Sequence, residues 1–178
     1  MGYSHSFHAI QPIEMGKWLE ITEALAEVIK NLPEHSSSAG GHYVEHPLIL
    51  QREYDDNSKP LMNRDEIRFN GAGELGHETF QLRRRESERY AFCKTNRKPY
   101  DFAVCAALIL THRYAPGHCA IKSDGEPGDW RPALIHCKET LGISDLELPP
   151  GVIDYEYDYV KMAPVEPWWK MNNAPAWF

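Results

Sequence analysis

The sequence predicts an α+β domain in which a small, mostly antiparallel sheet packs against about three helices. Short segments that alternate apolar and polar residues, as half-buried strands do, occur near the N-terminus and between residues 66 and 82. Apolar residues recur at three- and four-residue spacings over residues 14–31, and the run 102–110 is wholly apolar, which predicts one amphipathic and one buried helix. The composition, 42% hydrophobic and 25% charged, is typical of a globular protein.

The chain has 178 residues, enough to bury a core as one domain, which we assign to residues 1–150. Residues 151–178 are rich in aromatic residues and proline, and we expect them to pack on this domain or on a second subunit of a homo-oligomer. No run approaches the roughly 18–20 apolar residues of a membrane span, and the N-terminus lacks the layout of a secretory signal. We therefore expect a cytoplasmic protein that does not bind membranes.

The first half of the chain predicts a helix and several strands. Residues 2–10 alternate as a strand with Tyr3, His5 and Phe7 on one side. A helix over 14–31 is expected next, because proline residues bracket it. Further strands are predicted at 44–51, 66–70, 77–82 and 90–93; the second ends in an Asn70-Gly71 turn and pairs with the third as a hairpin.

The second half predicts two helices around one more strand. Pro99 and Asp101 suit the first turn of a helix that runs to about residue 113. A strand is expected at 119–122, then a polar turn and a helix from about Trp130 to Leu141 that Gly142 ends. The four cysteines form no Cys-x-x-Cys pair, so we expect reduced core thiols and predict no metal site and no cofactor.

A basic segment leads directly into the buried helix. Residues 83–98 carry seven basic and two acidic side chains, a net charge of +5, so the rest of the chain carries −12 to give the total of −7. A compact basic segment on an acidic protein favours a small anionic ligand over general nucleic-acid binding. A solvated basic loop is the alternative interpretation.

The start of that helix is the first candidate binding site. Free N–H groups, the helix dipole and the cations Lys94, Arg97 and Lys98 together suit a phosphate group. Thr95 and Asn70 are candidates to orient the ligand, and Phe92 or Tyr100 to stack on it. A glycine-rich phosphate loop is missing, so the same residues also fit an ordinary helix start.

The polar turn 123–129 is the second candidate. If both helix starts lie at one end of the sheet, Ser123, Asp124 or Trp130 meets the ribose or base of a nucleotide whose phosphates sit on the first helix. Two unrelated, well-capped helices remain the alternative.

The order of these motifs resembles a group of small uncharacterised proteins encoded by bacteriophages. The similarity covers roughly residues 67–130 and rests on Asn70-Gly71, Phe92-Cys93-Lys94-Thr95-x-Arg97-Lys98-Pro99-Tyr100-Asp101, and Ser123-Asp124-Gly125 with Asp129-Trp130. The group has no assigned activity, and this chain departs from it where Lys122-Ser123 replaces Ser-Ser. The resemblance implies a phage setting, in which small cytosolic proteins are often counter-defence factors and one class sequesters nucleotide signals of host immunity.

The sequence thus leads to three hypotheses. The first is binding, without turnover, of a phosphorylated nucleotide such as a cyclic dinucleotide or an ADP-ribose derivative, in the host cytoplasm. The second is a phosphodiesterase or nucleotide hydrolase that uses His77 and Asp124 as acid and base. The third is an inhibitor that binds a host defence protein through the basic segment and the Trp-rich C-terminal residues.

Overall fold

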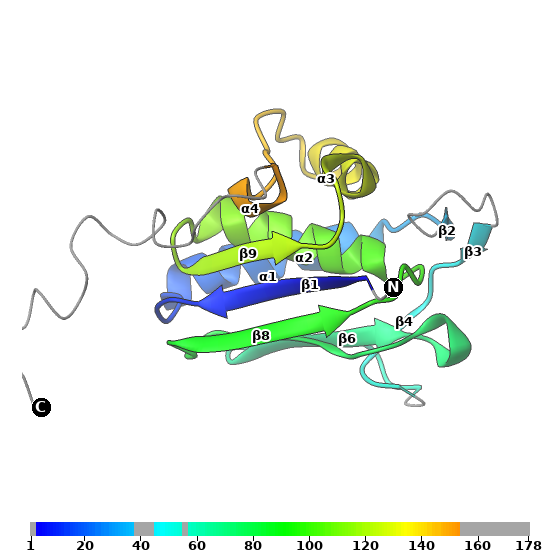
Figure 1. The fold of residues 1–178 in the computed structure, drawn as a ribbon, viewed down its shortest axis with the longest axis horizontal. Helices are drawn as coiled ribbons and strands as arrows, with labels where there is room; N and C mark the ends of the chain where they lie inside the picture. Colours follow the sequence, from blue (N-terminus) through cyan, green and yellow to red (C-terminus); the bar gives the residue numbers. More distant parts are fainter. Residues whose placement is uncertain (1–2, 38–44, 55–56, 154–178) are drawn as a thin grey trace, which may run out of the picture.

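A computed structural model describes residues 3–37, 45–54 and 57–153 and has the expected α+β architecture (Figure 1). Every strand pair in it is antiparallel. The strands are β1 (Ser4–Ala9), β2 (His35–Ser37), β3 (Glu45–Pro47), β4 (Leu50–Gln51), β5 (Leu61–Met62), β6 (Glu66–Gly71), β7 (Phe80–Arg83), β8 (Arg89–Lys94) and β9 (Cys119–Ser123). The helices are α1 (Met15–Lys30), the short 3-10 helix η1 (Gly73–Leu75), α2 (Asp101–Tyr114), α3 (Pro127–Leu141) and α4 (Pro150–Ile153).

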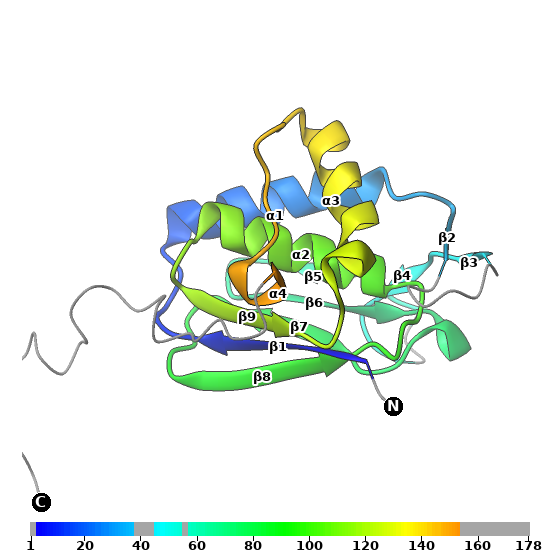
Figure 2. The same ribbon diagram turned by 45° about the horizontal axis from the view of Figure 1, so that its top comes forward.

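Two sheets form one layer of the molecule. One sheet has the order β8-β1-β9, and the other is built around β6, which pairs with β4, β5 and β7. The strands β2 and β3 form a separate pair. Figures 1 and 2 show the helices on one side of the sheets, with α1 and α2 side by side and α3 next to them. Within the described residues, one face of the β8-β1-β9 sheet points away from α1, α2 and α3, and α4 packs against β9 at the edge of this sheet.

The core is centred on α2, as its apolar run predicts. Every residue from Ala103 to Thr111 is buried. Strand β1 lies against this helix with the predicted side inward, because Tyr3, His5 and Phe7 are at most 4% exposed. Trp18 of α1 is fully buried and donates its indole N–H to the Asn63 carbonyl at 2.7 Å, which ties α1 to the end of β5. All four cysteines are buried and free, as predicted.

Two local predictions were wrong. Helix α3 begins at Pro127, three residues early, because Pro127 occupies its first turn and Glu126 and Asp129 form a reciprocal capping box. The expected turn at Asn70-Gly71 lies within β6, and the positive φ is at Gly73. Gly71 is needed for a different reason, since any Cβ there would clash with the Leu75 carbonyl.

The hairpin prediction was confirmed in its pairing, with Ile67 opposite Leu82, although β7 begins at Phe80 rather than at His77. The predicted strand 44–51 is divided into β3 and β4. The packing predicted for the C-terminal segment 151–178 falls mostly on residues 154–178, which lie outside the described residues. Within the described ranges, none of the helices is both long enough and apolar enough to cross a bilayer.

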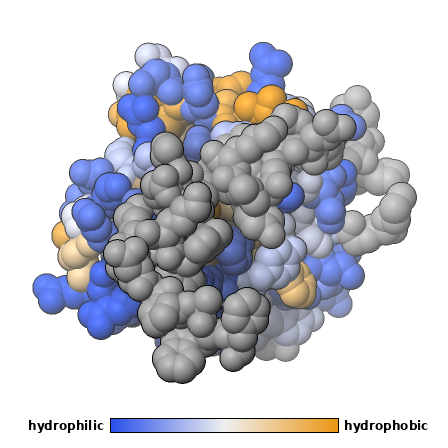
Figure 3. Space-filling model, turned by 60° about the vertical axis from the view of Figure 1, so that its left-hand side comes forward, coloured by the Kyte–Doolittle hydropathy of each residue, from blue (hydrophilic) through white to orange (hydrophobic). Residues whose placement is uncertain are grey.

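The surface has polar and apolar regions. In the coloured part of the face drawn in Figure 3, hydrophilic residues are frequent and apolar residues gather at the top. Large exposed hydrophobic side chains include Tyr54 on the loop after β4 and the pair Tyr90 and Phe92 on β8.

Candidate functional site

A tight turn between β8 and α2 directs the predicted site residues Thr95, Arg97 and Lys98 to different parts of the molecule. The Lys98 N–H donates to the Thr95 carbonyl at 3.0 Å, and both central residues are left-handed, Asn96 at φ 52° and Arg97 at φ 59°. This is the pattern of a type I′ turn, in which the second central position is usually glycine. A bulky arginine there holds backbone strain that the surrounding contacts must offset.

Thr95 points from this turn into a buried polar cluster. Its hydroxyl donates to Oδ1 of Asp101 at 2.5 Å, and Nε2 of His5 lies 2.6 Å from the same oxygen. Thr95 and His5 are fully buried, and Asp101 is 5% exposed. The carboxylate therefore holds β1 and the β8–α2 turn against the first turn of α2.

Ser123 connects the other side of His5 to the second predicted segment. Its Oγ accepts the Gly125 N–H at 2.8 Å and the Trp130 indole N–H at 3.2 Å. With both acceptor positions filled, the hydroxyl hydrogen must point to Nδ1 of His5, 3.0 Å away. The ring hydrogen of His5 is then on Nε2 and is donated to Asp101.

The two segments that the sequence singled out are thus close in space. Besides the His5 cluster, Arg97 joins them directly, with its Nη1 3.1 Å from Oδ1 of Asp129 and its guanidinium 4.1 Å from the centre of the Tyr3 ring. Asp124 accepts the Ser4 N–H at 2.9 Å, so the polar turn also closes the end of β1.

The chain Ser123–His5–Asp101 has the residue order of a serine hydrolase relay, but it lacks the access that catalysis requires. His5 is fully buried, with the rings of Tyr3 and Trp130 edge-on around it. The amides next to Ser123 are also engaged, because the Asp124 N–H donates to the Ser4 carbonyl and the Gly125 N–H to Ser123 itself. No oxyanion donor remains there, so the cluster serves as a structural lock.

The same cluster is also the one group of three close metal-ligating side chains among the described residues: His5, Asp101 and Cys105. Cys105 Sγ lies 3.9 Å from His5 Nε2 and 3.8 Å from Asp101 Oδ2. A metal on Nε2 requires a hydrogen on Nδ1, for which the filled Ser123 Oγ has no acceptor position. Burial, with the Asp101 charge as the second cause, raises the pKa of the Cys105 thiol and disfavours the thiolate. The hydrogen bonds of His5 therefore favour a structural role for this cluster over a metal site.

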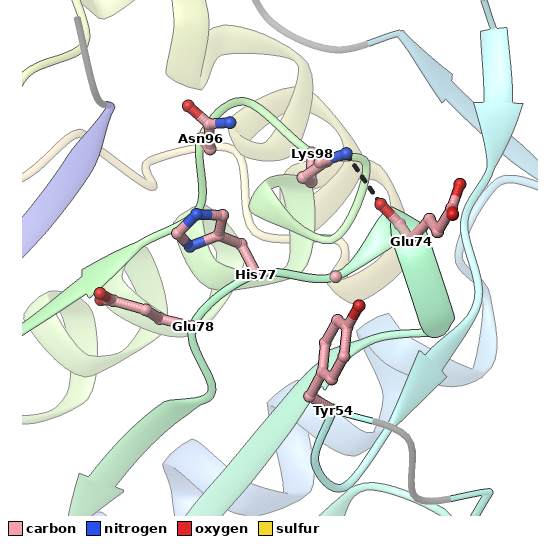
Figure 4. Close-up of a pocket in the computed structure, with 7 residues that line it drawn as sticks. Tyr54, Glu74, His77, Glu78, Asn96 and Lys98 are labelled. Atoms are coloured by element: carbon pink, nitrogen blue, oxygen red, sulfur yellow. Dashed lines mark hydrogen bonds between the residues drawn. The ribbon is translucent and has the colours of Figure 1, made fainter.

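An open hollow of about 630 Å³ lies on the other side of the turn (Figure 4). Tyr54 lies on one side of it and His77 and Lys98 on the other. Lys98 donates from Nζ to the Glu74 carbonyl at 2.8 Å and makes no ion pair among the described residues. Nδ1 of His77 is buried and has no hydrogen-bond partner there. The remaining lining residues are Glu74, Gly76, Glu78 and Asn96.

Two predicted site residues, Asn70 and Tyr100, are buried behind the lining of this open hollow, which we call the cleft. Asn70 is fully buried; its Oδ1 accepts the N–H groups of Gly71 and His77 at 2.8 and 3.1 Å, and its Nδ2 donates to the His77 carbonyl at 3.0 Å. Tyr100 is also fully buried and donates to the Glu78 carbonyl at 2.7 Å. Both side chains position the cleft wall, and neither is exposed for stacking on a ligand.

The predicted phosphate site at the start of α2 does not gather its three cations. Lys98 faces the cleft, Arg97 faces Asp129, and Lys94 follows Cys93 on β8, so it lies on the face away from the helices together with Phe92. The first amides of α2 are also engaged, since Asp101, Phe102 and Ala103 donate to the carbonyls three residues earlier. Trp130 is fully buried rather than free to stack.

The sequence interpretation missed several residues of both places. His5 had a signal, because it is on the inward side of a predicted strand, where a buried imidazole needs partners. Asn96 and Glu78 also had a signal, because each is close in sequence to a predicted site residue. Asn96 shares a turn with Lys98, and Glu78 follows His77. Tyr54 and Glu74 had no signal, because they are brought together by the pairing of β4 with β6, the strand before η1, and that pairing has no local sequence pattern.

No protein-family model, curated protein or solved structure matches the chain in the three comparisons made.

Proposed function

We propose that the protein binds a phosphorylated nucleotide-type ligand in the cleft between Tyr54 and Lys98 without converting it. The observation that supports this most is the combination, in one hollow, of a cation without an ion pair among the described residues and an aromatic ring that is 52% exposed. The volume of the hollow lies within the range of small-ligand pockets.

Each lining group has a role that its chemistry suits. The Lys98 ammonium attracts phosphate, and the Tyr54 ring offers a face on which a base stacks. His77 also lines the hollow, and its imidazole ring can exchange a hydrogen bond with a ligand hydroxyl or phosphate. Carboxylates of Glu74 and Glu78 suit ribose hydroxyls or the amino group of a base. The two carboxylates also set a limit, because they disfavour a ligand with several phosphates close together.

The hydrolase alternative finds less support. The Asp124 N–H donates to Ser4, Ser4 is paired with Lys94, and the Lys94 carbonyl accepts from Glu78. His77 and Asp124 are thus about three strand spacings apart, roughly 14 Å between backbones. Of the two, His77 lines the hollow and Asp124 does not, so this acid–base pair finds less support than binding without turnover.

The biological role that we propose is sequestration of a host signalling nucleotide, in the cytoplasm, to block anti-phage immunity. This part rests on the phage resemblance of residues 67–130. A homo-oligomer is proposed with it, on the basis of the aromatic C-terminal sequence.

The test is a thermal-shift screen with cyclic dinucleotides, ADP-ribose derivatives and mononucleotides, followed by chromatography of each ligand that raises the melting temperature. Binding to the folded state adds about 2.7 kcal/mol at a hundredfold excess over Kd. Lys98→Ala and Tyr54→Ala should each weaken binding about tenfold, with the ligand recovered intact. Lys30→Ala, which removes a charge from an exposed residue of α1, is the matched control and should change nothing.

Two outcomes contradict the proposal. Recovery of a converted ligand would favour the hydrolase. No shift with any nucleotide would favour the protein-binding inhibitor, for which a stable complex with a host protein should then be found.

A further inference from the structure

A second surface, separate from the cleft, has its own recognition chemistry. It is the face of the β8-β1-β9 sheet that, among the described residues, points away from α1, α2 and α3 (Figures 1 and 2), with α4 packed against β9 at its edge. The register places Phe92 opposite Ser6 and Ser6 opposite Lys122, with the rows Tyr90–His8 and Lys94–Ser4 on either side. We call these seven residues the outer sheet face.

Two large aromatic side chains stand out on this face. Tyr90 is 64% exposed and Phe92 is 57% exposed, the two highest values among the exposed aromatic side chains of the described residues. They are two residues apart on one strand, which places them about 7 Å apart along it. That spacing is about twice the 3.4 Å step between stacked bases. Each ring can therefore stack on one base of an extended single strand.

The surroundings of the rings suit a polynucleotide. A hollow of about 340 Å³ next to Tyr90 is also lined by Ser6, His8 and Lys122. The seven residues of the outer sheet face include two lysines, and a second hollow next to Tyr90 and Phe92 is lined by Glu86 together with Arg89. The hydroxyl groups of Ser4 and Ser6 lie between the aromatic strand and Lys122, where they can bond to bases or phosphates.

We propose that the outer sheet face binds single-stranded nucleic acid, with bases stacked on Tyr90 and Phe92 and with phosphates near Lys94 and Lys122. Aromatic residues on an open antiparallel sheet stack bases regardless of sequence, and lysines follow the backbone. The small number of cations limits this to a short segment of a few nucleotides.

The test is fluorescence anisotropy with labelled twelve-nucleotide oligothymidylate and oligouridylate at about 50 mM salt. Tyr90→Ala and Phe92→Ala should each weaken binding about tenfold, and Phe92→Tyr should restore it. Lys94→Ala should reduce the slope of log affinity against log salt by about one. Tyr54→Ala removes an exposed aromatic residue of the cleft and should leave oligonucleotide binding unchanged, which separates this proposal from the nucleotide site.

Several results would overturn the inference. They are no anisotropy change at low salt, equal weakening by Tyr54→Ala and Phe92→Ala, or preferential binding of a duplex of the same length. Sedimentation velocity tests whether a second copy of the chain occupies the outer sheet face instead. A dimer that dissociates in Phe92→Ala would identify the face as an interface between copies of this chain.

Discussion

The two sides of the Thr95–Lys98 turn hold similar kinds of residues in opposite situations. On the inner side, His5, Thr95 and Asp101 satisfy one another and are closed to solvent. On the outer side, Lys98 makes no ion pair among the described residues and Nδ1 of His77 has no partner. A histidine with every bond made stabilises the fold, whereas one with an unmade bond can serve a ligand. The two sides of the turn therefore differ in whether their polar groups already have hydrogen-bond or ion-pair partners, and not in the types of residue that they contain.

The largest expected effect tests the lock. Asp101→Ala removes the acceptor of two buried donors, so the free energy of unfolding should fall by at least about 3 kcal/mol in urea denaturation. Asp124→Ala is the matched control: this exposed carboxylate accepts one backbone N–H, and its loss should be about 1 kcal/mol or less. Similar losses of unfolding free energy in both variants would contradict the stronger structural role assigned to Asp101.

Asn70 belongs to both sides of the comparison, because it is buried and yet shapes the cleft. Asn70→Ala should lower the free energy of unfolding by about 2 kcal/mol, since the amides of Gly71 and His77 lose their acceptor. Ligand affinity should fall as well, although Asn70 does not line the cleft. Asn57→Ala, at an exposed position, should change neither quantity. Unchanged affinity in folded Asn70→Ala would show that the cleft is shaped by other residues.

The strained turn can be tested with two replacements of one residue. Both Arg97→Ala and Arg97→Gly remove the contacts with Asp129 and Tyr3, but only glycine relieves the left-handed backbone. The glycine variant should therefore be about 1 kcal/mol more stable than the alanine variant. Equal stability by urea denaturation would mean that the turn relaxes when the arginine side chain is absent.

The smallest effect concerns a histidine outside both sites. Burial lowers the pKa of His112, and Glu147 partly opposes this. The folded protein then binds fewer protons than the unfolded chain, so stability should decrease as pH falls below about 6.5. His112→Gln should flatten this part of the melting-temperature profile. A profile identical to that of the parent protein would assign the acid sensitivity to other groups.

Much of the fold could be predicted because its signals are local. The helix expected at residues 14–31 is Met15–Lys30, and the buried helix after Pro99 is Asp101–Tyr114. The inward alternation of Tyr3, His5 and Phe7 needs only the period of a strand. The start of α3 was missed because Glu126 is a less common cap than the aspartate three residues later.

The site was harder to predict because it depends on where the side chains point and not only on which residue types are present. Lys94, Arg97 and Lys98 are neighbours in sequence, but strand alternation and two left-handed residues send them to three different places. Nothing in the sequence requires Asn96 and Arg97 to be left-handed, since neither is glycine. The closeness of Arg97 and Asp129 depends in turn on the pairing of β1 with both β8 and β9.

The turn also connects these places mechanically. The Asn96 amide donates to the Tyr3 carbonyl and the Lys98 amide to the Thr95 carbonyl, so neither hydrogen can exchange with solvent unless the turn opens. A ligand on Lys98 that steadies this turn slows deuterium uptake at both amides, and with them at the edge of β1. Two backbone hydrogens can therefore report occupancy of the cleft without any label on the ligand.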